Sequence, residues 1–233
     1  MATPTRFTSG ISTDEKTGPL GMLGFPSPIQ YHTYFNDFDV YAAGDWTVTE
    51  TQAGATQALA DGDAGTLLLT NSAADNDIVQ MALTKEGFKL ASGKKTWFAI
   101  RFKVSDATQS DVVCGLHITD TSPVAGAPSD GVWFRKDDGD TNIDLVSGLN
   151  STYATATALG TLADDTFVNL AFYFDGKTSV AGYVNGVKKA TLSVSSSTTL
   201  CTDEELLVAF AIQNGEAAAK TMTVDYVFAC KER

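Results

Sequence analysis

Short runs of alternating apolar and polar residues fill the chain from Tyr31 onward. In the clearest run, Trp97–Val104, the even-numbered positions are apolar, whereas Arg101 and Lys103 stand between them. Because successive side chains of a strand point to opposite faces, this pattern predicts a strand with one buried and one solvated face. Such strands are typical of antiparallel sheets.

Further strand candidates follow at short intervals, with turn residues between them. No segment combines helix caps with a periodic apolar face, and neither an internal repeat nor a linker divides this part of the chain. The sequence therefore predicts one all-β, antiparallel sandwich over residues 31–233. The expected strands are Tyr31–Phe35, Trp46–Thr49, Thr66–Thr70, Asp77–Leu83, Lys95–Val104, Asp111–Thr119, Gly131–Lys136, Asn142–Val146, Phe167–Phe174, Ser179–Val184, Val187–Val194, Leu206–Gln213 and Thr221–Ala229.

Three dipeptides between strand candidates have the chemistry of two-residue hairpin loops. They are Asp138-Gly139, Asp175-Gly176 and Asn185-Gly186. Asp, Asn and Gly tolerate the positive φ that such loops require. We expect each dipeptide to join two neighbouring antiparallel strands.

Large aromatic residues of the strands are expected to fill the core, although Trp97 and Phe98 cannot both face the same way. Cys114, inside an apolar run, is expected to be a small buried hydrophobe. An odd count of 3 cysteines argues against a disulfide framework, with a Cys201–Cys230 bridge as the alternative. The predicted core aromatics are Trp97, Phe98, Phe102, Phe172, Phe174 and Phe210.

Residues 1–30 differ from the rest, because glycines and prolines punctuate apolar residues that follow no period. A freely disordered tail is poorer in apolar residues, so we interpret the segment as an extended arm. Two placements stay open: the arm packs on its own domain, or it lies on a neighbouring subunit. Its candidate partner-binding residues are Phe7, Ile11, Leu20, Met22, Leu23 and Phe25.

The charge balance excludes some partners. With a net charge of −12, the chain repels phosphate backbones and anionic lipid surfaces, so we expect no direct nucleic-acid or membrane binding. The first residues have no apolar stretch that could be a secretion signal, and no run is long enough to span a bilayer. We therefore expect synthesis and assembly in the cytosol.

Catalytic patterns are missing from the sequence. A glycosidase needs two carboxyl groups held close together, and no Glu-x-Asp-x-x-Glu run occurs; Asn142-Ile143-Asp144 and Asp203-Glu204-Glu205 fit poorly. His32 and His117 both lie in strand-like runs without a nucleophile motif beside them. We expect no catalytic residues and no cofactor.

A calcium site is the weaker interpretation of one acidic segment. Asp138, Asp140, Asn142 and Asp144 alternate like the first ligands of a calcium loop, but Ile143 stands where that loop needs glycine. Along a strand these side chains would form a row instead of converging, which favours a plain hairpin.

Carbohydrate binding would need exposed aromatic side chains. Trp46 and Trp133 are the candidates, but both lie in apolar alternation, so a core position is favoured for each.

Several stretches resemble known proteins. Phe167–Gly176, Tyr183–Gly186 and Val224–Phe228 resemble the hairpin and the last strand of laminin-G-like and concanavalin-like jelly rolls. Tyr34–Asp39 and Phe134–Asp140, together with Gly44–Glu50 and Thr221–Val227, resemble virion proteins of tailed bacteriophages. The resemblance implies a non-enzymatic jelly roll on a capsid or tail.

This resemblance sets the functional expectation. The first hypothesis is a capsid decoration or cement protein on the outer surface of a virion, bound to the major capsid protein through its arm and assembled in the host cytoplasm as a homo-oligomer, with a trimer favoured. The alternatives are a tail or head fibre module that binds host-surface carbohydrate, and a secreted sugar-binding or glycan-processing domain.

Overall fold

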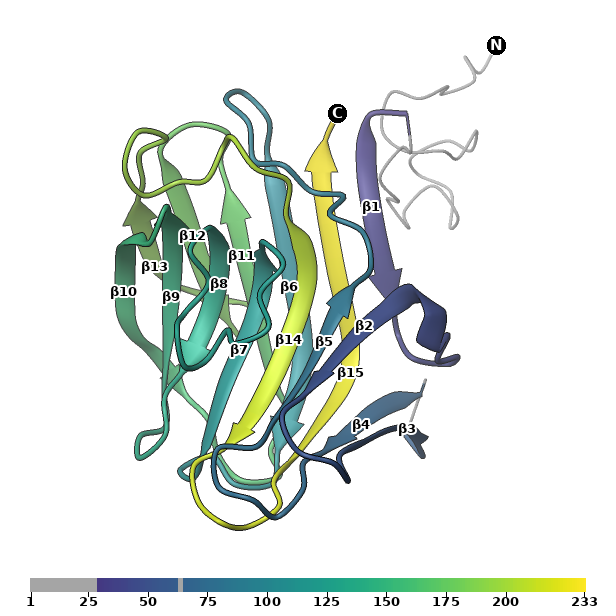
Figure 1. Ribbon diagram of the computed structural model, residues 1–233. Helices are drawn as coiled ribbons and strands as arrows, with labels where there is room; N and C mark the ends of the chain where they lie inside the picture. Colours follow the sequence, from purple (N-terminus) through teal and green to yellow (C-terminus); the bar gives the residue numbers. More distant parts are fainter. Residues whose placement is uncertain (1–28, 63–64) are drawn as a thin grey trace.

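Two antiparallel sheets face each other across one hydrophobic core (Figure 1). The computed structural model describes residues 29–62 and 65–233, and the arm residues Phe7 to Phe25 lie outside them. Within the described residues the elements are β1 (Tyr31–Asn36), the 3-10 turn η2 (Ala43–Asp45), β2 (Trp46–Glu50), β3 (Thr56–Ala60), β4 (Thr66–Thr70), β5 (Ile78–Leu83), β6 (Thr96–Val104), β7 (Ser110–His117), β8 (Gly131–Lys136), β9 (Asn142–Leu149), β10 (Thr152–Thr161), β11 (Val168–Phe174), β12 (Ser179–Val184), β13 (Val187–Ser193), β14 (Leu207–Asn214) and β15 (Thr221–Glu232).

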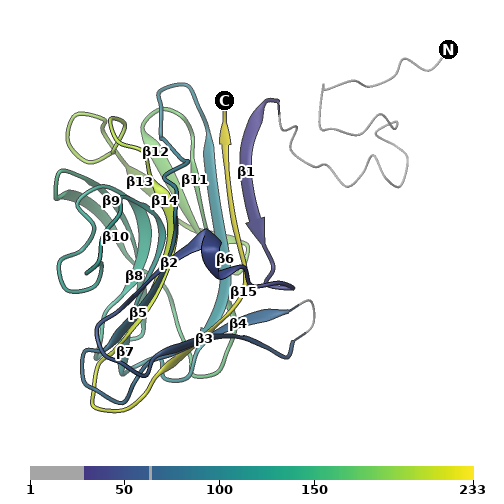
Figure 2. The same ribbon diagram turned by 45° about the vertical axis from the view of Figure 1, so that its right-hand side comes forward.

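The first sheet, called sheet A here, has the strand order β13-β12-β11-β6-β15-β4-β3, and β1 also pairs with β15. Sheet B has the order β10-β9-β8-β7-β14-β5-β2. Tyr31 at the start of β1 lies opposite Glu232, so the point where the arm joins the domain is next to the C-terminus (Figure 2). No helix among the described residues has the length and hydropathy needed to cross a membrane.

The predicted all-β sandwich is confirmed, and each expected strand has a counterpart. Two strands were not predicted, β3 and β10, which lie at edges of sheets A and B. Edge strands bury little surface, and these two consist largely of Thr, Ala and Gln or Gly, so they lack the apolar alternation that marks a strand.

Only one of the three predicted hairpin loops has two residues. Asn185 and Gly186, with φ of 50° and 76°, join β12 directly to β13, as a type I′ turn does. Asp138-Gly139 and Asp175-Gly176 also join neighbouring antiparallel strands, β8 to β9 and β11 to β12, as expected. Only the predicted loop length was wrong for these two, because they lie within the longer loops 137–141 and 175–178. Asp175 explains the second loop, because its carboxylate accepts hydrogen bonds from the backbone N–H groups of the three residues Lys177 to Ser179.

Aromatic rings join the two sheets in the core. Phe98 of β6 stacks on Phe172 of β11 at 5.4 Å, and Phe134 of β8 lies 6.2 Å from Phe172 across the sandwich. The prediction of burial was wrong for Trp97, which lies half-buried on the outer face of sheet A because it alternates with Phe98. The confirmed core aromatics are Phe98, Phe102, Phe172, Phe174 and Phe210.

Candidate functional site

The outer face of sheet B has no carboxyl group at its centre. Alternation along β7, β8 and β14 turns small or apolar residues outward, because their sequence neighbours, such as Cys114 and Phe210, lie in the core. A glycosidase needs two carboxyl groups about 5–10 Å apart. The outward positions at the centre instead carry Val113, Gly115, Trp133, Ala209 and Ala211. The outward carboxyl groups of Asp111 and Asp144 lie near one end of the sheet, close to the starts of β7 and β9.

Part of this face is also covered. Val113, Trp133 and Val146 form an apolar cluster of their own, separate from the main core, and Val124 and Ala127 pack against it. The segment between β7 and β8 therefore lies over the outer face of sheet B. A saccharide cannot stack on Trp133, which is 0% exposed, nor on Trp46, which is 5% exposed, so the favoured core interpretation of both is confirmed.

The acidic segment Asp137–Asp144 does not converge on one point. Arg135 pairs with Asp137 at 3.1 Å and with Asp144 at 3.8 Å, on either side of the loop. The carboxylate of Asp140 accepts hydrogen bonds from the backbone and the side chain of Asn142. These contacts hold a loop between β8 and β9, as the hairpin interpretation predicts.

One group of possible metal ligands occurs among the described residues. Ligand atoms of Asp130, Cys201 and Asp203 lie within 4.8 Å of one another. Asp130 already accepts hydrogen bonds from Ser129 at 2.6 Å and from the backbone of Asn150 at 2.8 Å. Burial raises the pKa of Cys201 to about 11, which keeps the thiol protonated at neutral pH. Through its two hydrogen bonds, Asp130 fixes the loop before β8 to the turn between β9 and β10.

Both histidine side chains pack against neighbouring residues of the fold. His32 lies 4.8 Å from the ring of Phe88, and burial, with Lys231 and Arg233 nearby, lowers its pKa. Burial also lowers the pKa of His117, whose Nδ1 lies 2.7 Å from the carbonyl oxygen of Ile118. All three cysteines are free and buried, so the alternative of a Cys201–Cys230 bridge is wrong.

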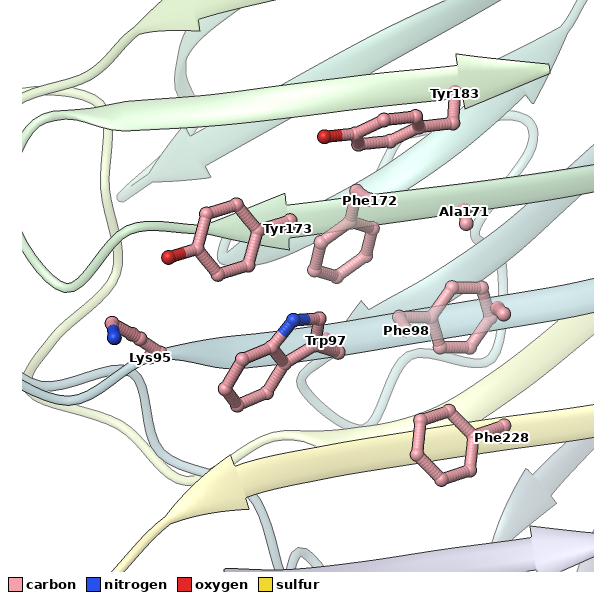
Figure 3. A pocket seen from close by; sticks show the side chains of 9 residues that line it. Lys95, Trp97, Phe98, Ala171, Phe172, Tyr173, Tyr183 and Phe228 are labelled. Atoms are coloured by element: carbon pink, nitrogen blue, oxygen red, sulfur yellow. The ribbon is translucent and has the colours of Figure 1, made fainter. Parts of the chain in front are cut away.

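An aromatic hollow of about 440 Å³ lies on the outer face of sheet A, and we call it the aromatic groove. Strand register explains its shape. One row of paired residues crosses the strands β12, β11, β6 and β15, and it consists of Tyr183, Ala171, Ala99 and Phe228 in that order. The two alanines therefore form a floor between two aromatic side chains. The alanines stop at Cβ, which leaves the space open (Figure 3).

Neighbouring rows close the groove at both ends. Trp97 and Tyr173 lie opposite each other in the next row, with ring centroids 5.4 Å apart, and Tyr31 packs on Trp97 at 6.0 Å. On the other side, Asn169 donates a hydrogen bond of 2.6 Å to the hydroxyl of Tyr226. This pair forms a polar ridge between the groove and the rest of the face.

Polar atoms of the groove are available to a ligand. The hydroxyls of Tyr173 and Tyr183 form no hydrogen bond within the described part of the chain, and both point toward the Lys95 end in Figure 3. Aromatic faces beside a few free donors and acceptors are typical of small-molecule and saccharide sites.

Sequence reasoning missed this site, although one signal was present. The conflict between Trp97 and Phe98 meant that one large aromatic residue had to face outward. Which residues stand beside Trp97 depends on the pairing of β6 with β11 and β15, and pairing between distant segments is not encoded in local periodicity.

Comparison with known proteins gives the fold its name. No protein-family model matches the sequence, and no curated protein has a significantly similar sequence. Solved structures do match, and they identify the fold as a concanavalin-like, lectin-like jelly roll. At 14% identity or less, the likeness extends to the fold alone.

Three of these structures illustrate the range. A protein of unknown function from Shewanella oneidensis is 14% identical with a TM-score of 0.63, over 95% of this chain and 97% of that one. An endo-1,3-β-glucanase from Streptomyces sioyaensis is 13% identical with a TM-score of 0.62, over 87% and 96%. The lectin UEA-II, solved with galactose, is 12% identical with a TM-score of 0.58, over 87% and 99%.

Proposed function

We propose that the chain is a non-catalytic, lectin-like domain that binds saccharides in the aromatic groove of sheet A. The observation that carries the proposal is the row Tyr183–Ala171–Ala99–Phe228, which is closed at one end by Trp97 and Tyr173. Sugar rings have apolar faces that stack on aromatic rings, and hydroxyl groups that bond to tyrosine and indole donors.

Both lectins and glycan-cleaving enzymes occur among the structures with this fold, so the fold does not decide between binding and catalysis. Two observations support binding. The outward centre of sheet B lacks a carboxylate pair, and the aromatic groove contains no carboxyl group. We expect no hydrolysis of β-glucans, chitin or peptidoglycan; reproducible turnover that one carboxylate substitution abolishes would contradict this.

Replacing Trp97 tests the site. Trp97→Ala removes the largest stacking surface, so affinity for a saccharide ligand is expected to fall roughly tenfold or more, as at other aromatic hot spots. Tyr153→Ala is the matched control, because Tyr153 is a 38% exposed aromatic residue on sheet B. Glycan-array binding and titration calorimetry give the readout. Equal losses for both variants, or no loss for Trp97→Ala, would overturn the site.

A second candidate function is attachment to a larger particle, as a virion decoration protein or a fibre module. It is favoured by the exposed apolar side chains of Ile29, Phe35 and Val40, which are 64%, 59% and 71% exposed. Ile29 lies where the arm joins the domain, Phe35 lies near the other end of β1, and Val40 lies in the loop that follows β1. An arm that carries further apolar residues could extend this surface onto a major capsid protein or a neighbouring subunit, with a trimer as the favoured assembly. In a fibre module, the groove would bind host-surface carbohydrate.

Deleting residues 1–28 tests attachment. The sandwich should stay folded, because its core lies within residues 29–233, whereas binding to particles should be lost. Gel densitometry of purified particles gives the copy number: hundreds of copies indicate decoration, and a few indicate a fibre. Full decoration by the truncated protein would show that the arm is not the anchor.

A further inference from the structure

A second hollow, of about 670 Å³, lies on the same face beyond the Asn169–Tyr226 ridge. Both hollows follow β6, whose outward residues Trp97, Ala99, Arg101 and Lys103 alternate with core residues. At about 3.3 Å per residue, Trp97 and Lys103 are roughly 20 Å apart along the strand. An extended ligand lying along β6 would therefore contact both hollows.

The second hollow contains cations held in fixed positions. The guanidinium of Arg101 lies 4.3 Å from the ring centroid of Phe167 and forms an ion pair with Asp225. The ammonium of Lys103 lies 5.5 Å from the same ring. The ring of Phe167 and the carboxylate of Asp225 thus orient Arg101, and the same ring contacts Lys103 as well.

Lys103 differs from Arg101 in its partners. Arg101 neutralises Asp225, whereas no carboxylate of the described residues lies within ion-pair distance of Lys103. Asp61 also lines the hollow but forms no ion pair with Lys103. Among the described residues, Lys103 is thus a cation without an ion-pair partner at a hollow, in a chain with 28 acidic and 16 basic residues, and it offers a site for an outside anion.

We infer that the second hollow is an anion subsite for a carboxylate group of the bound glycan. Resting on the proposed function, this assigns the ligand class: an acidic oligosaccharide, with sugar rings on Trp97 and Tyr173 and a uronic or sialic carboxylate near Lys103. A neutral glycan would fill the aromatic groove and leave Lys103 solvated.

Matched glycan pairs test the subsite. The probes are hexasaccharides of β-1,4-glucan and β-1,4-glucuronan, those of β-1,4-mannan and β-1,4-mannuronan, and N-acetyllactosamine with and without sialic acid. The acidic member of at least one pair should bind more tightly, and its advantage should shrink at high salt. Lys103→Gln should lower affinity for that acidic member about two- to fivefold, as for one partly exposed ion pair, and leave neutral binding unchanged.

Controls separate this inference from the proposed function. Lys85→Gln removes an exposed lysine after β5 and should change neither affinity. If Trp97→Ala abolishes binding but acidic and neutral members bind equally, or if Lys103→Gln leaves the acidic preference intact, the anion subsite is wrong and the saccharide site stands. If no member of any pair binds, both proposals are wrong.

Discussion

Trp97 and Phe98 are adjacent in the sequence and lie on opposite faces of sheet A. Phe98 is 1% exposed and stacks on Phe172, whereas Trp97 packs on Tyr31 and Tyr173 at the surface. One residue supports the fold and its neighbour supports the proposed binding site. Substitutions at such neighbouring positions should therefore separate stability from binding.

The pair Phe172 and Tyr173 on β11 gives a stability test of this kind. Phe172→Ala should lower the free energy of unfolding by about 3–5 kcal/mol, because it leaves a cavity between the two sheets. Tyr173→Ala removes a half-buried ring from the outer face and should cost far less. Urea unfolding followed by fluorescence measures both; a loss under about 1 kcal/mol for Phe172→Ala would mean that β11 is misplaced.

The cysteines give a residue-scale prediction about pH. Burial raises the pKa of Cys114 strongly, and burial, with acidic neighbours, raises those of Cys201 and Cys230 to about 11. Since the thiolate is the reactive form, few thiolates exist at pH 8 in the folded protein. A thiol-specific chromogenic reagent should therefore label the native protein slowly and all 3 cysteines after unfolding. Rapid labelling of the native protein, or one reactive thiol after unfolding, would contradict this.

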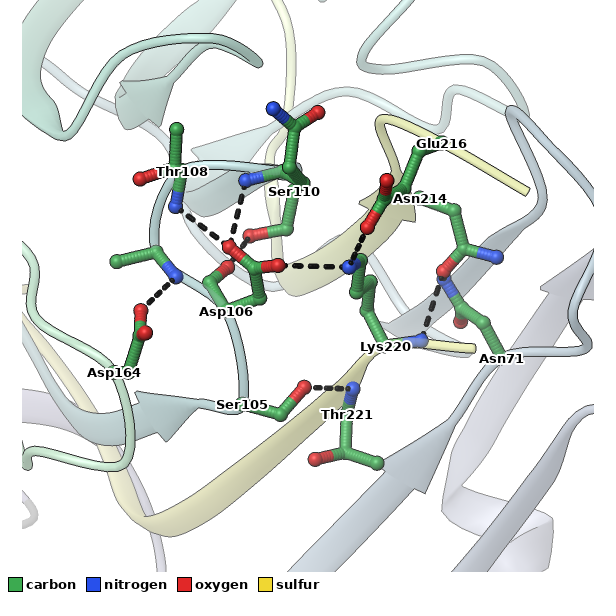
Figure 4. Close-up of polar contacts among 12 residues, drawn as sticks. Asn71, Ser105, Asp106, Thr108, Ser110, Asp164, Asn214, Glu216, Lys220 and Thr221 are labelled. Carbon is green, nitrogen blue, oxygen red and sulfur yellow. Dashed lines mark hydrogen bonds and ion pairs between the residues drawn. The ribbon is translucent and has the colours of Figure 1, made fainter. Parts of the chain in front are cut away.

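At the scale of elements, a polar network ties the two sheets together at one end of the sandwich (Figure 4). Asn71, just after β4, donates to Asn214 at the end of β14, and the backbone N–H of Lys220, just before β15, donates to the same Asn214 side chain. The Lys220 ammonium pairs with Asp106 at 2.8 Å and Glu216 at 2.6 Å. The network joins the ends of β4, β6 and β15 in sheet A to the end of β14 in sheet B, and no strand pairing among the described residues links these two sheets.

Asp106 makes this network sensitive to pH. Burial would raise the pKa of Asp106, but hydrogen bonds from Lys220 and from the backbone of Gln109 and Thr108 outweigh it and hold the pKa below the ordinary 3.8. A carboxyl group whose pKa is lower in the folded state stabilises the fold above its unfolded pKa, and this stabilisation is lost as the pH falls through the folded value. Asp106→Asn should thus cost about 1–3 kcal/mol at pH 7, and the difference from the wild type should shrink as the pH falls below 3.8.

Urea unfolding at pH 7 and pH 3 measures the effect of Asp106→Asn. Glu205→Gln is the control, since Glu205 forms a surface pair with Lys89 and its removal should leave stability unchanged. An equal loss at both pH values would mean that Asp106 acts by packing and not by charge.

At the scale of the whole molecule, the sequence predicts the arrangement of strands in a sandwich, but it does not predict which side chains lie together on the outer faces of the sheets. Alternation in runs such as Trp97–Val104 identifies strands because the space between the two sheets is filled mainly by apolar side chains. Edge strands such as β10 bury few side chains, so their sequences lack this alternation and do not predict a strand. The aromatic groove depends on register between segments up to about 130 residues apart, such as Ala99 and Phe228, which local patterns do not specify.

The central claim is that saccharides bind to sheet A, and indole signals test it most directly. The chain has 3 tryptophans, which give three separate indole N–H signals in a nitrogen-15 NMR spectrum. Trp46 and Trp133 are buried, while Trp97 lines the groove. Titration with a saccharide that the array identifies should move the Trp97 signal and leave the other two in place. Saturable binding with an unmoved Trp97 signal, or no binding by any glycan of the array, would contradict the account.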